Sequence, residues 1–80
     1  MLISDEIVSA EIVQQLRIKA FLKGVSQTDI SKSVKEHRET VSKRLKSSDM
    51  KLSEFIRYSR AINEDPSKLF HEGFTHLDSK

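Results

Sequence analysis

Hydrophobic residues recur at helical spacing along most of the chain, and no segment shows the alternation of a β-strand. The longest stretch predicts a helix over residues 10–23, with Asp5 as an alternative, earlier start. Gly24 ends this helix, because glycine is favoured just past a helix C-terminus. The apolar stripe of this first segment consists of Ile12, Val13, Leu16, Ala20, Phe21 and Leu22.

Two short helices are predicted next, within residues 26–47. Ser26 is a favourable N-cap for the first, and Asp29 completes a capping box. The second covers residues 38–47. Each offers two apolar positions four residues apart, which are Ile30 with Val34 and Val41 with Leu45. Such a pair, joined by a tight turn and packed on the remaining helices, is typical of a helix-turn-helix whose second helix can enter a DNA major groove.

Two more helices are predicted in the C-terminal part. Residues 51–63 are the most regular amphipathic segment, and Asp65 caps a helix that opens with Pro66. The expected inward residues are Leu52, Phe55, Ile56, Ser59, Ile62, Leu69 and Phe70. Residues 72–80 lack a clear period and predict a loose tail, and residues 1–9 are interpreted as an arm. The expectation is a single compact all-α domain of five helices over residues 1–80.

Charge is unevenly distributed along the chain. Residues 1–25 balance to zero, residues 26–51 hold seven basic and four acidic side chains, and residues 52–80 carry a net charge of −1. The positive charge therefore lies on the two short helices, which suggests a polyanionic partner, although a solvated surface gives the same pattern.

Other classes of protein find little support in the sequence. The chain has no cysteine, which suits a reducing cytoplasm, and no apolar run approaches the ~18 residues that span a membrane. The acidic residues near the N-terminus argue against a secretory signal. His71 and His76 match no common metal spacing, and we find neither a nucleophile–base pair nor a phosphate loop. We expect no enzyme activity, no cofactor, no small-molecule substrate and no membrane partner.

Residues 12–71 resemble the lambda-repressor-like family of bacterial and phage DNA-binding domains, which includes the Cro-like and Xre-like regulators. The resemblance rests on Gly24-Val25-Ser26-Gln27, on the four apolar positions of the short helices, and on Ile62 followed by Asp65-Pro66 and Leu69. The chain departs from the family pattern in the turn. It has Ser31 where alanine is usual, Lys35 where glycine is frequent, and Glu36 where an apolar residue is frequent.

The resemblance implies a role for ten residues. The positions that read base edges in the major groove are Arg38, Glu39, Thr40, Ser42 and Lys43. The positions that hold DNA phosphates are Gln27, His37, Arg44, Lys46 and Lys51.

The resemblance implies a transcriptional regulator that binds double-stranded DNA, a Cro-like repressor with activation left open. One recognition helix contacts only about four or five base pairs, so a homodimer on a two-fold operator is expected. Dimer contacts could come from residues 1–3 with Ile7 and Val8, or from Phe74 and Leu77. Two alternatives remain open at this point: a protein-binding module such as an antirepressor or antitoxin, and a fragment of a larger repressor.

Overall fold

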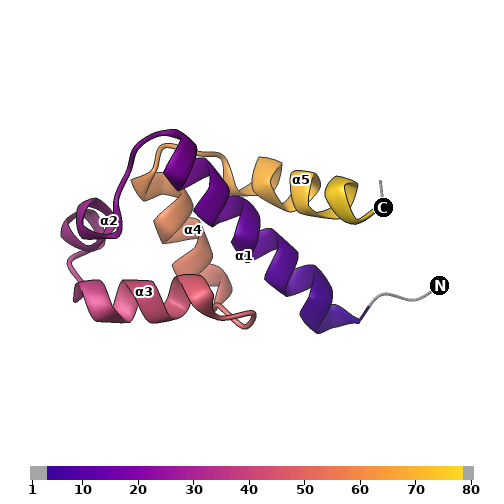
Figure 1. Ribbon diagram of the computed structural model, residues 1–80, viewed down its shortest axis with the longest axis horizontal. Helices are drawn as coiled ribbons and strands as arrows, with labels where there is room; N and C mark the ends of the chain where they lie inside the picture. The colour runs from indigo at the N-terminus through magenta and orange to yellow at the C-terminus, as the bar shows by residue number, and fades with distance from the viewer. Residues whose placement is uncertain (1–3, 79–80) are drawn as a thin grey trace.

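The computed structural model describes residues 4–78, which fold into helices and contain no strand. The chain within this range is all-α, as the hydrophobic pattern predicts (Figure 1). The five helices are α1 (Asp5–Leu22), α2 (Gln27–Val34), α3 (Arg38–Lys46), α4 (Leu52–Ala61) and α5 (Pro66–Asp78).

The long helix α1 crosses the middle of the molecule and organises the rest. It packs along α5 on one side and against α3 and α4 on the other (Figure 1). The short helices α2 and α3 pack on each other and on α4 or α1, at the end of the molecule opposite α5. This arrangement leaves one side of α3 without a covering helix.

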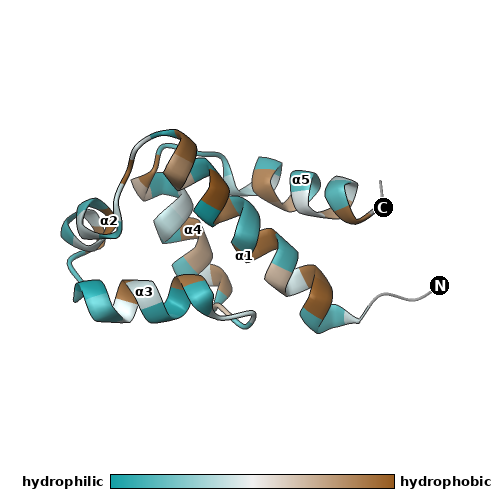
Figure 2. Cartoon of the chain, viewed as in Figure 1, coloured by the Kyte–Doolittle hydropathy of each residue, from teal (hydrophilic) through white to brown (hydrophobic). Residues whose placement is uncertain are grey.

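The core lies where α1, α3 and α4 meet. Its buried members come from all five helices and are Ile12, Leu16, Ala20, Ile30, Val41, Leu45, Phe55, Tyr58, Ile62 and Leu69. Phe55 and Phe70 meet edge to face with ring centroids 5.1 Å apart, which ties α4 to α5. The short helices contribute few of these residues, and Figure 2 shows α3 as mostly hydrophilic ribbon.

The predicted helix starts are confirmed at two places. The Asp29 N–H donates to Ser26 Oγ at 3.1 Å, and the Ser26 N–H donates to Asp29 Oδ2 at 3.0 Å, which completes the capping box. At α5, Pro66 is the first helical residue and the Ser67 N–H donates to Asp65 Oδ1 at 3.0 Å. Local side-chain chemistry therefore fixes where α2 and α5 begin.

The N-terminal arm is shorter than the sequence suggested. Ser4 caps α1 by accepting from the Ile7 N–H, so residues 5–9 are helical. Residues 1–3, the rest of the predicted arm, lie outside the described residues.

Four predicted core residues are exposed instead. Phe21 and Leu22 are each 74% exposed at the end of α1, and Leu52 and Ile56 are 60% and 38% exposed on α4. Helical spacing gives the direction of a side chain, but it does not say how far the neighbouring helices extend. No described helix covers these four positions.

The expectation of a loose tail from residue 72 is wrong up to Asp78, because α5 continues to that residue. The close approach of α5 to α1 depends on Gly73. A β-carbon there would lie 2.8 Å from Ile12 Cγ1 and 3.2 Å from Ile12 Cα. The periodicity was hidden because a glycine, rather than an apolar side chain, occupies the contact.

Candidate nucleic-acid interface

The outward side of α3 presents a row of polar side chains. Val41 and Leu45 are buried against the core, which fixes the rotation of the helix and turns the remaining positions outward. These outward positions and the start of α2 together form a shallow hollow of about 320 Å³. The hollow is lined by Gln27, Arg38, Glu39, Ser42, Lys43 and Lys46.

All six of these lining residues were predicted from the sequence to contact DNA. Arg38, Glu39 and Ser42 lie at the start and middle of α3, and Lys43 and Lys46 extend the row toward its end. Three cations and one carboxylate line the hollow, so its charge is positive. Apart from Ser42, which is half-buried, these side chains are exposed and therefore accessible to a partner.

Three further predicted residues lie outside the hollow. His37 is exposed at the N-cap of α3 and makes no capping hydrogen bond with its side chain. Lys51 is exposed at the N-cap of α4. Thr40 is half-buried, and its spacing of four residues from Arg44 places it on the flank of α3 rather than among the lining residues.

Gln27 is held at the edge of the hollow by the start of α2. It is the first residue of that helix and directly follows the capping residue Ser26. The hydrogen bonds from Ser26 lower the pKa of the Asp29 carboxyl, so this carboxylate stays charged at the positive end of the helix dipole. The capping box thus orders the turn that carries Gln27.

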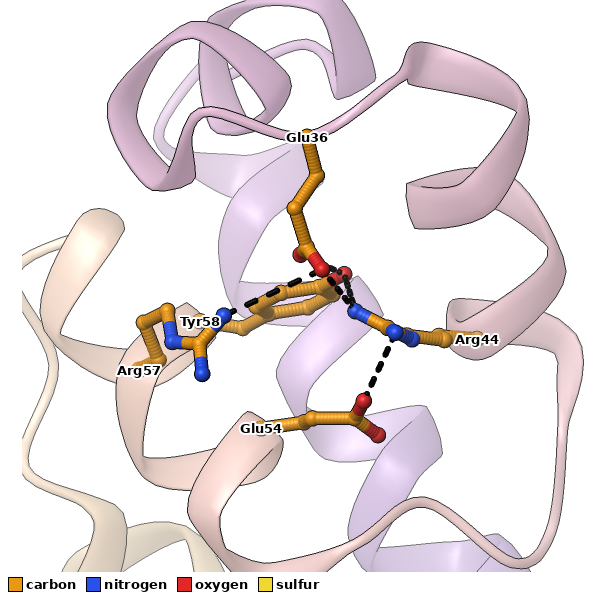
Figure 3. Close-up of polar contacts among 5 residues, drawn as sticks. All are labelled: Glu36, Arg44, Glu54, Arg57 and Tyr58. Atoms are coloured by element: carbon orange, nitrogen blue, oxygen red, sulfur yellow. Dashed lines mark hydrogen bonds and ion pairs between the residues drawn. The ribbon is translucent and has the colours of Figure 1, made fainter.

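Arg44, the remaining predicted residue, is engaged inside the protein. Its guanidinium pairs with Glu36, lies 2.9 Å from the Glu54 carboxylate, and is 3.3 Å from the Tyr58 hydroxyl. Figure 3 shows this side chain turned toward α4 and the turn before α3. The donors of Arg44 are thus shared with partners of its own chain, and its phosphate contact stays a prediction.

These residues form a polar cluster that joins α3 to α4, which we call the α3–α4 clamp (Glu36, Arg44, Glu54, Arg57 and Tyr58). The Tyr58 hydroxyl donates to Glu36 Oε1 at 2.8 Å, and Arg57 lies 3.8 Å from Glu36 Oε2. In Figure 3 the two arginines approach Glu36 from opposite sides. The clamp therefore fixes the position of α3 relative to the body of the domain.

The clamp also sets the ionisation of its members. Burial tends to raise the pKa of Glu36, but the hydrogen bond from Tyr58 and the contacts with Arg44 outweigh it and lower the pKa. Burial raises the pKa of Tyr58, whose side chain is fully inside the protein. At neutral pH the clamp thus combines a charged Glu36 with a neutral phenol.

The clamp was missed in the sequence, although part of it carried a signal. Tyr58 lies three residues after Phe55 and four before Ile62, which is the spacing of a buried helical face. Glu36, Arg44 and Glu54 have no such signal, because their partners lie on different elements.

Residues 4–78 contain neither a metal-binding cluster nor a membrane-spanning helix. No group of three or more His, Asp or Glu side chains there is placed to hold a metal ion. None of the helices in that range has the length and apolar character needed to cross a membrane. Comparison of the chain with protein-family models, with curated proteins and with solved structures found no match.

Proposed function

We propose that this protein is a sequence-specific DNA-binding transcriptional regulator, a Cro-like repressor with a lambda-repressor-like fold in which α2 and α3 form the helix-turn-helix. The observation that carries the proposal is the hollow beside α3. Six of the ten residues expected to contact DNA line this one exposed, positively charged surface. Nucleic-acid readers need such a basic surface with hydrogen-bonding side chains at its centre.

Each lining residue has a role that follows from its chemistry. Arg38 can donate two hydrogen bonds to guanine O6 and N7, and Glu39 can accept from cytosine N4. Ser42 and Lys43, which come next along α3, contact neighbouring base edges. Gln27 and Lys46, which also line the hollow, bind phosphates, and this fixes the register without reading sequence.

A homodimer completes the proposal, and a groove formed by α1, α4 and α5 supports it. Val8 and Phe74, taken from the two alternative sets of dimer residues, line the same groove, together with Met50 and Leu52. The groove has a volume of about 300 Å³. Of its lining residues, Leu52 on α4 and Phe74 on α5 are 60% and 49% exposed. We propose that this α1–α4–α5 groove packs against a second copy, because exposed apolar side chains of this number favour association.

The first experiment is selection from a pool of random-sequence duplex DNA, at low and at moderate salt, followed by sequencing of the bound fraction. We expect affinity to fall steeply with salt and the enriched sequences to share a two-fold motif. Arg38→Ala should cost about 1–3 kcal/mol and relax the preference at one base pair of each half-site.

Lys68→Ala on α5 is the matched control, since it removes an exposed cation far from the hollow. It should leave both affinity and motif unchanged. Absence of binding at low salt would overturn the proposal and favour a protein-binding module instead.

The dimer is tested with Phe74→Ser in the groove and Phe21→Ser on the far end of α1. We expect Phe74→Ser to abolish cooperative binding to a two-fold site and to reduce dimer formation in sedimentation, while binding to one half-site persists. Phe21→Ser removes an even more exposed phenylalanine and should change neither measurement. The reverse result would place the dimer contact at the C-terminal end of α1, around Phe21.

A further inference from the structure

A second hollow lies on another side of the molecule from α3. It is formed between the C-terminal end of α2 and the outer face of α4, and its volume is about 480 Å³. None of its lining residues belongs to the DNA-contacting hollow. A space of this size accepts one or two side chains of a partner.

Two arginines of α4 give this α2–α4 hollow its charge. Arg57 and Arg60 are three residues apart and therefore project from the same side of the helix. Arg60 makes no ion pair within residues 4–78, and Arg57 has only the 3.8 Å contact with Glu36. No carboxylate lines the hollow, so both guanidinium groups have donors left for an anionic partner.

Apolar side chains line the hollow beside these arginines. They are Val34 of α2 with Ile56 and Ala61 of α4, next to Ser33 and Ser53, and Ile56 is 38% exposed. A phosphate of DNA, or a free phosphate, would use the arginines but leave Val34 and Ile56 in contact with water. An acidic protein segment satisfies both features, since it brings carboxylates together with an apolar side chain.

We propose that the α2–α4 hollow binds an acidic segment of another protein, with carboxylates on Arg57 and Arg60 and one apolar side chain over Val34 and Ile56. The guanidinium groups bind carboxylates in paired hydrogen bonds, and burial of the apolar side chain adds the remaining affinity. This site goes beyond the proposed regulation of DNA, because its residues are separate from those that contact the duplex. DNA and an acidic partner can therefore be bound at the same time.

The probe for this site is a short end-blocked peptide of alanine, leucine and glutamate, with the leucines at helical spacing. Titrated into isotope-labelled protein, it should shift the NMR signals of Ser33, Ile56 and Arg60. The same peptide with glutamine in place of glutamate should leave these signals unchanged. Loss of one charge-assisted contact in Arg60→Gln should weaken binding at least about tenfold.

Three controls make the result decisive. Arg60→Lys should keep part of the affinity, and Lys68→Gln, which removes an exposed cation from α5, should keep all of it. Thermal unfolding of each variant should match the natural chain, because Arg60 is exposed.

Four outcomes would overturn the proposal. Peptide-induced shifts confined to Arg38 and Lys43 would show that the peptide binds the DNA-contacting hollow instead. Equal binding of the glutamine peptide would show that only the apolar side chains contribute to affinity. A loss of DNA affinity in Arg60→Gln as large as that in Lys43→Ala would make Arg60 a phosphate contact. Absence of any shift at the hollow would remove the site without affecting the proposal on DNA.

Discussion

Single residues control the turn that positions α3. Lys35, directly after α2, has φ 58° and ψ 46°, in the left-handed region that residues with a β-carbon enter at a cost. Its N–H and that of Glu36 both donate to the Ser31 carbonyl, which closes the end of α2. The turn thus keeps a conformation that glycine adopts without strain, although lysine occupies the position.

Replacing Lys35 by glycine should therefore stabilise the protein. We expect Lys35→Gly to raise the free energy of unfolding by about 0.5–1 kcal/mol, because relief of the left-handed strain exceeds the added entropy of the unfolded chain. Lys32→Gly, inside α2, should lower it by a similar amount. Urea denaturation of both variants checks the prediction, and equal effects of the two substitutions would contradict it.

The sequence was most informative at this same scale. Ser26 and Pro66 mark helix starts through hydrogen bonds within a few residues, so their roles are visible without the fold. The exposure of Phe21 and the ion pairs of Arg44 could not be predicted, because both depend on elements distant in the sequence. Phe21 lies beyond the reach of the neighbouring helices, and the partners of Arg44 come from a turn and from α4.

Between elements, the packing of α5 on α1 depends on a missing side chain. Alanine is the better helix former by about 1 kcal/mol, yet at position 73 its methyl group would overlap Ile12. We expect Gly73→Ala to lower the free energy of unfolding by about 1–2 kcal/mol, since the backbone of α1 must move to make room. Thr75→Ala, at an exposed position of the same helix, should leave stability unchanged or raise it slightly. A more stable Gly73→Ala variant in thermal denaturation would show that α1 and α5 separate easily.

Two adjacent residues of α3 allow stability to be tested separately from the proposed DNA binding. Arg44→Ala leaves Glu36 and Glu54 facing each other without their shared cation and should cost about 2–3 kcal/mol of stability. Lys43→Ala, at an exposed position, should change stability by less than about 0.5 kcal/mol but weaken DNA binding. Denaturation and DNA titration of the two variants check this division. Unchanged stability in Arg44→Ala would show that its ion pairs do not stabilise the fold and would favour a DNA contact for Arg44.

For the molecule as a whole, the charged groups set the response to acid. The folded state lowers the pKa of Glu36 and of Glu64 below the ordinary value of 4.5, with Lys23 as the main cause for Glu64. A lowered pKa contributes stability above that value and loses it as the pH falls further. The free energy of unfolding should therefore hold from pH 7 to about 5 and decline below 4.5.

Glu36→Gln tests the source of this decline. Glutamine does not ionise, so the variant should be less stable at pH 7 and lose less stability between pH 5 and 3. Asp49→Asn, in the exposed loop after α3, is the control for removal of a carboxylate. Urea midpoints across this pH range check the prediction, and parallel curves for Glu36→Gln and the natural chain would rule out the clamp as a source.

The position of Tyr58 gives the protein an internal optical reporter. Tyr58 is the single tyrosine of the chain, and the chain has no tryptophan, so the tyrosine emission of the protein comes from one phenol. That phenol is buried beside Arg44 and donates a hydrogen bond to the Glu36 carboxylate, a contact that quenches tyrosine fluorescence. A movement of α3 and its preceding turn away from α4 would lengthen this hydrogen bond, and we expect the emission to brighten. The position of α3 relative to α4 can therefore be followed by fluorescence in the natural, unlabelled chain while a duplex or an acidic peptide is added.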